Sequence, residues 1–312
     1  MQKVIVCDYT YFQHQSIFSR NNALVRKEQL MQTNPQEAQK MFIPPSTYTV
    51  LSSLIGALKK VGINDENGDI VILAVDSRHS WRKDVDPDYK GKRGEQRKQA
   101  SFVNWEREYE AHNNLLDKIN NNLPFWIISA PNCEADDIIS VTCRFFNDKQ
   151  VIIVSPDKDF FQLLTLDNVK VFSPHPHPSV KKCPYRILDL DREKEKRKAY
   201  KSLIGKIRKE TSDDLTSEIS NELQFDDRKK IVDLLQIPKF IVNRIKPQLE
   251  KIVNIEKINF NPEVFSPGIQ NKLSTLYSQD SIITWDDCYK KLERKLNKKR
   301  KEKKSKIKLD KA

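Results

Sequence analysis

The chain contains 312 residues, and its 55 Lys and Arg against 43 Asp and Glu give a formal net charge of +12. This length can form one large domain or a domain with a smaller appendage. No apolar run approaches the roughly 20 residues that span a bilayer, and Asp8 interrupts the N-terminus before a signal-peptide core forms. Five cysteines without a Cys-x-x-Cys pair favour reduced thiols. We therefore expect an unprocessed cytoplasmic protein that makes no membrane contact.

The positive charge is concentrated in three segments. Residues 290–312 carry 13 basic and 3 acidic side chains, residues 192–209 carry 9 and 2, and residues 78–98 carry 8 and 4. Because the whole chain carries only +12, the remainder of the chain has a net charge of −9. An acidic body with basic segments is typical of a metal-dependent enzyme that acts on phosphate esters.

Five short apolar runs are predicted as strands. Their hydrophobicity is nearly continuous rather than alternating, which indicates strands buried on both faces and therefore a mostly parallel sheet. The runs occupy residues 3–7, 69–75, 125–128, 150–154 and 169–172.

Helical patterns alternate with these runs. Apolar residues repeat at helical spacing in 50–58, with Gly62 as a stop signal, and again in 115–119 and 138–146. This alternation predicts an α/β fold in which helices flank a twisted, mostly parallel sheet. We expect a core at 1–190 that includes a basic arch or loop at 78–105. A smaller C-terminal helical lobe follows at 191–289, and a basic tail at 290–312.

Acidic residues follow four of the predicted strands. The carboxyl ends of parallel strands lie along one edge of a sheet, so we expect these side chains to converge there. A helix cap or a turn explains any one of them, but caps do not require the Asp-x-Asp and Glu-x-Asp-Asp doublings. Clustered carboxylates without His or Cys favour Mg²⁺ or Mn²⁺ as the bound ion. The residues are Asp8, Asp76, Glu134, Asp136, Asp137, Asp157 and Asp159.

Together with the basic segment, these acids resemble the flap endonuclease/5′→3′ exonuclease family, especially bacteriophage members of the T-even ribonuclease H type. The motifs that carry the resemblance are Trp81-Arg-Lys-Asp84, Tyr89-Lys-Gly-Lys-Arg93, Glu134-Ala-Asp-Asp137 and Ser155-Pro-Asp-Lys-Asp-Phe160. The resemblance implies a PIN-like α/β core. It also implies a nuclease that removes RNA primers and 5′ flaps during DNA replication with two Mg²⁺ ions, for which Mn²⁺ can substitute.

The same resemblance implies roles for the acids. It assigns four of them to a first metal ion: Asp8, Asp76, Glu134 and Asp136. It assigns three to a second ion: Asp157, Asp159 and the shared Asp136. Asp137 belongs to the same cluster, through a metal-bound water. The family's last acidic element is altered at residues 209–215, where Glu210 and Asp213 take the acidic positions and a helix cap at 211–213 stays an open alternative.

The basic segment receives roles in the same way. Arg82 and Lys90 match a pair of catalytic residues that hold the scissile phosphate. Four neighbours are expected to guide a single-stranded 5′ end: Lys83, Lys92, Arg93 and Arg97. Tyr89 is expected to stack on a base, with Trp81 and Trp105 as alternatives. A solvated loop with incidental charge also explains this segment.

We expect the substrates to be DNA and RNA–DNA duplexes with 5′ ends or flaps, bound by a monomer. A single-strand-binding protein and a sliding clamp are the expected protein partners. Two other functions stay open: a DNA-junction-binding protein without catalysis, and an RNA endonuclease on the same core. Residues 20–45 have no functional account from the sequence.

Overall fold

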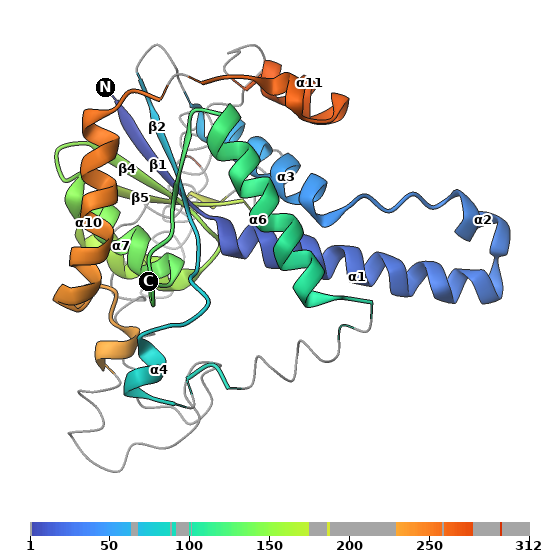
Figure 1. Cartoon of the computed structure of the whole chain (residues 1–312), viewed down its shortest axis with the longest axis horizontal. Coiled ribbons are helices and arrows are strands. Elements are labelled where there is room, and N and C mark those ends of the chain that lie inside the picture. The colour runs from blue at the N-terminus through green and yellow to red at the C-terminus, as the bar shows by residue number, and fades with distance from the viewer. Residues whose placement is uncertain are drawn as a thin grey trace, which may run out of the picture.

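The computed structural model contains one six-stranded sheet at its centre (Figure 1). The structure describes residues 2–63, 68–87, 89–91, 100, 102–174, 186–187, 229–257, 259–276 and 294. The strands are β1 (Lys3–Asp8), β2 (Ile70–Ala74), β3 (Phe125–Ile128), β4 (Gln150–Val154), β5 (Val169–Ser173) and β6 (Arg186–Ile187). Their order across the sheet is β3-β2-β1-β4-β5-β6.

The first five strands are parallel, as predicted, and β6 pairs antiparallel with β5. Successive side chains of β1 point into separate hydrophobic clusters: Ile5 and Cys7 on one face, Val4 and Val6 on the other. Burial on both faces explains the continuous apolar runs. Because β2 and β3 extend to one side of β1 and β4 and β5 to the other, the strand order reverses between β1 and β4. Ligands of open α/β sheets bind at this position, beyond the carboxyl ends of the strands.

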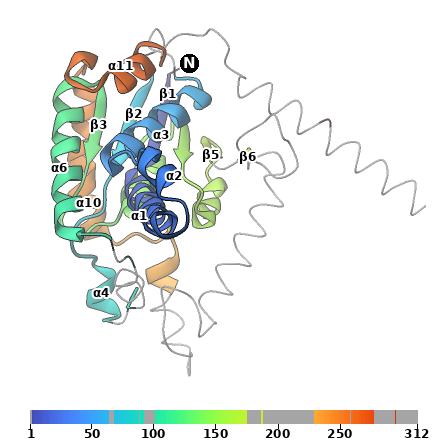
Figure 2. The same ribbon diagram turned by 90° about the vertical axis from the view of Figure 1, so that its right-hand side faces the viewer.

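Helices cover both faces of the sheet (Figures 1 and 2). One face packs against α1 (Tyr9–Thr33), α3 (Ser46–Val61), α6 (Trp105–Asn122) and α11 (Pro267–Ser274). The other packs against α7 (Ala135–Phe145), the 3₁₀ helix η1 (Lys158–Thr165) and α10 (Lys239–Asn254). The three helices expected from periodicity are thus confirmed as α3, α6 and α7. Gly62 ends α3 in the left-handed conformation, with φ 75°.

Helix α1 was not expected from the sequence and accounts for much of the 20–45 segment. Its buried residues end at Asn21, so its outer half and the short helix α2 (Pro35–Lys40) extend away from the sheet (Figure 1). The outer half lacks an apolar stripe because it contacts little of the core, and this left no periodicity to detect.

The described C-terminal residues pack on the same core as the strands. Ile241, Ile245 and Leu249 of α10 join the cluster around α7, while Ile269 of α11 joins the cluster around α3. The predicted boundary at 190, the rest of the predicted lobe, and the tail apart from Arg294 lie outside the described residues. None of the described helices is long and apolar enough to cross a membrane.

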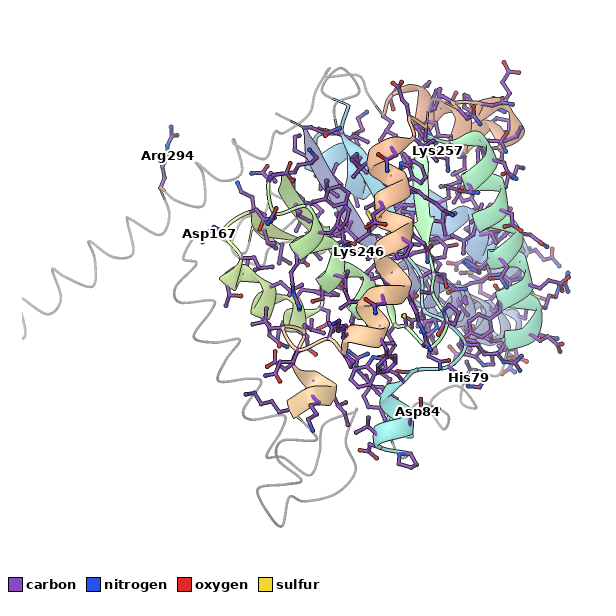
Figure 3. The ribbon with its side chains drawn as sticks, turned by 60° about the vertical axis from the view of Figure 1, so that its left-hand side comes forward. His79, Asp84, Asp167, Lys246, Lys257 and Arg294 are labelled. Atoms are coloured by element: carbon purple, nitrogen blue, oxygen red, sulfur yellow. The ribbon has the colours of Figure 1, made fainter. Side chains whose placement is uncertain are left out.

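Part of the predicted basic arch forms the short helix α4 (Arg82–Val85). His79 and Asp84 lie near one end of α10, whereas Lys257 lies beyond its other end (Figure 3). The segment after β2 therefore runs past the carboxyl edge of the sheet toward the start of α10.

Candidate active site

A cavity of about 790 Å³ opens at the carboxyl edge of the sheet. Five of the seven acids that were predicted at the strand ends contribute to its lining: Asp8, Asp76, Glu134, Asp136 and Asp157. Three basic side chains of the segment after β2 also line it: Arg78, Lys83 and Lys90. The convergence of acids from four strand ends is therefore a feature of the fold, and the volume falls in the range of ligand-binding clefts.

Asp8 ends β1 and caps α1. Its Oδ1 accepts a hydrogen bond from the Tyr11 backbone N–H at 3.0 Å, and its Oδ2 accepts one from the Ser155 hydroxyl at 3.1 Å. The pKa of this carboxyl is raised to about 7, mainly by burial and also by the charges of Asp76 and Asp157, against the opposing effect of the two hydrogen bonds. A nearby cation would favour the charged form.

Asp76 and Asp136 face the same cavity from the ends of β2 and the start of α7. The Oδ1 of Asp76 accepts a hydrogen bond from the Ala135 N–H at 2.7 Å, which ties the end of β2 to the first turn of α7. Burial raises the pKa of Asp136 well above its usual value; Lys90 opposes this effect, and the charges of Asp157, Asp8 and Glu134 add to it. The cavity thus crowds carboxylates against one another.

Asp157 and Asp159 follow β4 at the start of η1. Asp157 is exposed and lines the cavity, and its Oδ1 accepts a hydrogen bond from the Asp159 N–H at 2.9 Å. Ser155, whose hydroxyl donates to Asp8, also accepts from the Asp157 N–H at 3.2 Å. Ser155 therefore links two strand ends, a role that the sequence analysis did not assign. Asp159 is half-buried and lies outside the cavity lining.

Glu134 caps α7, and three basic-segment side chains surround its carboxylate. Its Oε1 lies 2.7 Å from Lys90 Nζ, while its Oε2 lies 3.0 Å from Arg82 Nη1 and accepts a hydrogen bond from the Tyr89 hydroxyl at 3.0 Å. Burial favours the neutral acid, but Lys90 and Arg82 outweigh it and lower the pKa of Glu134. This carboxylate is consequently neutralised by the protein itself.

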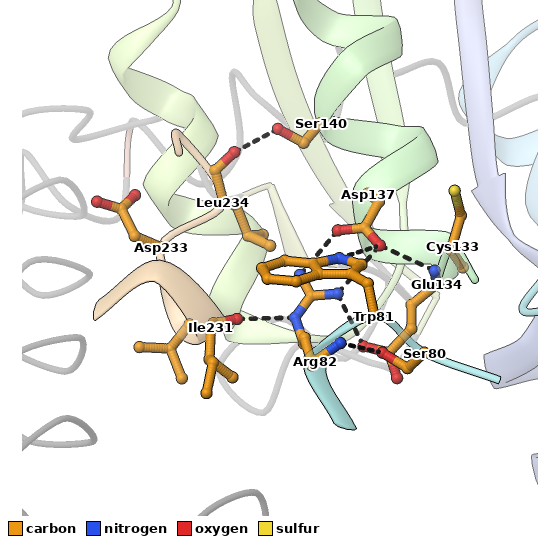
Figure 4. Close-up of polar contacts among 12 residues, drawn as sticks. Ser80, Trp81, Arg82, Cys133, Glu134, Asp137, Ser140, Ile231, Asp233 and Leu234 are labelled. Atoms are coloured by element: carbon orange, nitrogen blue, oxygen red, sulfur yellow. Dashed lines mark hydrogen bonds and ion pairs between the residues drawn. The ribbon is translucent and has the colours of Figure 1, made fainter. Parts of the chain in front are cut away.

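Asp137 is completely buried and lies against Arg82 (Figure 4). Its Oδ1 lies 2.8 Å from Arg82 Nη2, and its Oδ2 accepts hydrogen bonds from the Glu134 N–H at 2.9 Å and from Trp81 Nε1 at 3.1 Å. Glu134 and Asp137 form a capping box that starts α7. In this arrangement Asp137 pairs with Arg82 and lies outside the lining of the cavity.

Three side chains that were predicted to contact nucleic acid are buried in this arrangement. Arg82 is 2% exposed and Tyr89 is 4% exposed, so neither presents its side chain to solvent. Trp81 is also buried, whereas Lys83 is exposed and lines the cavity. Five predicted site residues lie outside the described part of the chain: Lys92, Arg93, Arg97, Glu210 and Asp213.

The donor set of the cavity has the chemistry of a hard divalent cation site. The acids that line it are carboxylates, and burial together with their mutual charge raises the pKa values of Asp8 and Asp136. Within the described residues, no group of three His, Cys, Asp or Glu side chains is already placed to hold one ion. An ion held directly by three of these carboxylates would therefore require them to turn toward a common point.

The fold and the cavity define an α/β domain with a carboxylate cluster at the switch point of its parallel sheet. Residues 46–199 match the family described as the 5′-3′ exonuclease, N-terminal resolvase-like domain. The matched residues include the motifs from Trp81 to Phe160, so the match agrees with the resemblance that these motifs indicated.

Individual relatives are more distant. A ribonuclease H of Enterobacteria phage T4 is 32% identical over 108 residues, which cover 33% of this chain and 35% of that relative. A bacteriophage T5 flap endonuclease in complex with DNA and metal ions is 17% identical, with a TM-score of 0.45 over 93% of this chain and 97% of the other. Another T5 structure, co-crystallised with metal ions, is 15% identical, with a TM-score of 0.44 over 95% and 99%. The match to the T4 protein thus spans about a third of its length, and the two structural likenesses are weak.

Proposed function

We propose that this protein is a divalent-cation-dependent 5′ nuclease that hydrolyses phosphodiester bonds in DNA and RNA–DNA duplexes with 5′ ends or flaps. The observation that carries the proposal is the cavity at the strand ends, where five carboxylates lie beside three basic side chains. Removal of RNA primers and 5′ flaps during DNA replication is the corresponding cellular role. The family match and the name of the T4 relative support this class of reaction.

The proposed cofactor is Mg²⁺, two ions, with Mn²⁺ as a substitute. Bound ions would supply an activated water and neutralise the leaving oxygen of the phosphodiester. The first-site ligands in the proposal are Asp8, Asp76, Glu134 and Asp136. Asp157 and Asp159 hold the second ion together with Asp136. Glu210 and Asp213 stay predicted ligands.

The basic side chains of the cavity have a separate task. Lys83 and Lys90 lie on the same cavity as the carboxylates and attract the phosphate backbone to them. Lys90 lies 2.7 Å from Glu134, so its ammonium is already held beside the acids at which the phosphate would bind. Lys92, Arg93 and Arg97 stay predicted contacts of the 5′ strand. A single-strand-binding protein and a sliding clamp likewise stay predicted partners.

A labelled substrate tests this function. We expect the wild-type protein to release 5′ products from a 5′-labelled flap in the presence of Mg²⁺, and Asp157→Asn to lose most of this activity. Asp117→Asn is a matched control, because Asp117 is an exposed acid of α6 outside the cavity lining. Tight flap binding by the wild-type protein without cation-dependent cleavage would instead indicate a DNA-junction-binding protein. Preferential cleavage of free single-stranded RNA would indicate an RNA endonuclease.

A further inference from the structure

We propose that Arg82 is a positioning residue that holds Glu134 and Asp137 and clasps the C-terminal segment 229–237 against them, and that it makes no contact with substrate phosphate. The statements about nucleic acid and cations rest on the proposed function. The clasp itself does not, because it is defined by contacts within the chain.

All three nitrogens of the Arg82 guanidinium are engaged inside the protein (Figure 4). Nε donates to the Ile231 carbonyl at 2.7 Å, and Nη1 lies 3.0 Å from both Glu134 Oε2 and Asp137 Oδ2. Nη2 lies 2.8 Å from Asp137 Oδ1, and the group lies 4.8 Å from the centre of the Trp81 ring. A phosphate could reach this guanidinium only if these bonds broke, which would leave the fully buried Asp137 without its counter-charge.

The segment that Arg82 contacts is fastened to the core at further points. The Leu234 carbonyl accepts hydrogen bonds from the side chains of Ser140 and Arg144 on α7, and the Leu234 N–H donates to Gln162 Oε1 at 3.1 Å. Figure 4 shows the Arg82 and Ser140 contacts on neighbouring parts of this segment. Arg82 therefore joins three parts of the chain: α4, the start of α7, and the residues that lead into α10.

The lysines on either side of this network are placed differently. Lys83 and Lys90 line the cavity, whereas Arg82 does not. Lys90 has a positive φ of 57°, a conformation that non-glycine residues seldom adopt and that often marks functional positions. The geometry thus assigns phosphate contact to the lysines and support of the acidic cluster to the arginine.

The salt dependence of DNA binding distinguishes these roles. We would measure flap-DNA affinity in EDTA from low to moderate salt for the wild-type protein, Arg82→Gln and Lys90→Gln. Loss of one phosphate contact lowers the slope of log affinity against log salt by about 0.9. We expect this loss for Lys90→Gln and an unchanged slope for Arg82→Gln. A slope reduced by about 0.9 in Arg82→Gln would overturn the proposal.

Cation binding without DNA separates positioning from a purely structural role. We expect Arg82→Lys, which keeps the charge but loses the forked contacts, to bind Mn²⁺ roughly 10-fold to 100-fold more weakly by electron paramagnetic resonance. Tyr89→Phe removes one hydrogen bond to Glu134 and should show a smaller loss in the same direction. Wild-type Mn²⁺ affinity in both variants would contradict a positioning role.

Thermal unfolding in EDTA tests the clasp independently of the proposed function. We expect Arg82→Gln and Asp137→Asn each to lower Tm by roughly 5–10 °C, and the double variant to fall by clearly less than the sum. Additive shifts would overturn the clasp. If Arg82→Gln does not fold, Arg82→Met, which also removes the charge, takes its place in the cycle and in the salt series. A wild-type protein that binds neither flap DNA nor Mn²⁺ would refute the proposed function and leave this cycle to decide the clasp.

Discussion

Two pairs of carboxylates at the carboxyl edge of the sheet differ in how their charge is balanced. Glu134 and Asp137 lie against Arg82 and are compensated within the protein. Asp8 and Asp136 face the cavity, where burial and neighbouring acids raise their pKa values. The difference teaches that side chains of the protein balance the charge of the first pair, whereas the second pair concentrates negative charge that a bound cation can balance.

The largest expected effect concerns the cavity pair. Asp136→Asn should lower the rate of Mg²⁺-dependent flap cleavage by about 10²-fold to 10³-fold, because a cation ligand contributes several kcal/mol to stabilisation of the transition state. The variant should unfold at the same or a higher temperature in EDTA, since it removes one repelling charge. Rates from single-turnover kinetics check the first expectation. A variant of normal activity and lower Tm would place Asp136 with the compensated pair.

Substitution in the compensated pair should lower the stability of the protein, unlike Asp136→Asn. Asp137→Asn leaves the buried Arg82 charge without its main partner and should lower the free energy of unfolding by about 3 kcal/mol in urea denaturation. Asp117→Asn, at an exposed position, serves as the matched control and should change the free energy of unfolding by less than about 0.5 kcal/mol. Equal effects of the two substitutions would show that the buried pair contributes little to stability.

The pH dependence of stability sharpens the same comparison. The folded-state pKa of Asp8 is about 7 against its usual value of 3.8, so folding favours the protonated acid. Protonated Asp8 therefore makes its full contribution to the free energy of unfolding below about pH 4. This contribution, on the order of 2–4 kcal/mol, is lost as the pH rises toward 7. Urea denaturation in EDTA at several pH values should show this fall in the wild-type protein and a reduced fall in Asp8→Asn. An identical pH profile for both would contradict the assignment.

A smaller effect is expected at Ser155. Its hydroxyl donates to Asp8 and lowers the pKa of that carboxyl against the effect of burial. Ser155→Ala should reduce stability by about 1 kcal/mol and move the Asp8-dependent part of the pH profile to higher pH. A profile that moves to lower pH would show that the hydroxyl does not stabilise the charged form.

The strands and the convergence of acids could be predicted because both depend on local sequence. Parallel strands buried on both faces need continuous apolar runs, and parallel pairing brings the residues after them to one edge. Asp8, Asp76 and Asp157 were located in this way. By contrast, the outer half of α1 contacts little of the core, so its sequence carries no apolar stripe.

The burial of Arg82 and Tyr89 could not be predicted by the same reasoning. Charged residues in a basic segment indicate solvent exposure, and here the compensation comes from side chains and a carbonyl that are remote in sequence. Glu134 lies 52 residues from Arg82, and Ile231 lies 149 residues away. Only the packing of α4 against α7 and the segment before α10 brings these groups together. The capping box between Glu134 and Asp137 is local, but its sequence pattern does not reveal that Asp137 is fully buried.

The most direct test of the central claim is Mn²⁺ binding to the DNA-free protein at pH 8, measured by electron paramagnetic resonance. We predict that the wild-type protein binds Mn²⁺ and that Asp136→Asn loses most of this affinity, with Asp117→Asn unchanged. This outcome would show that the crowded carboxylates of the cavity take up the cation. Equal Mn²⁺ binding by the wild-type protein and Asp136→Asn would contradict the account.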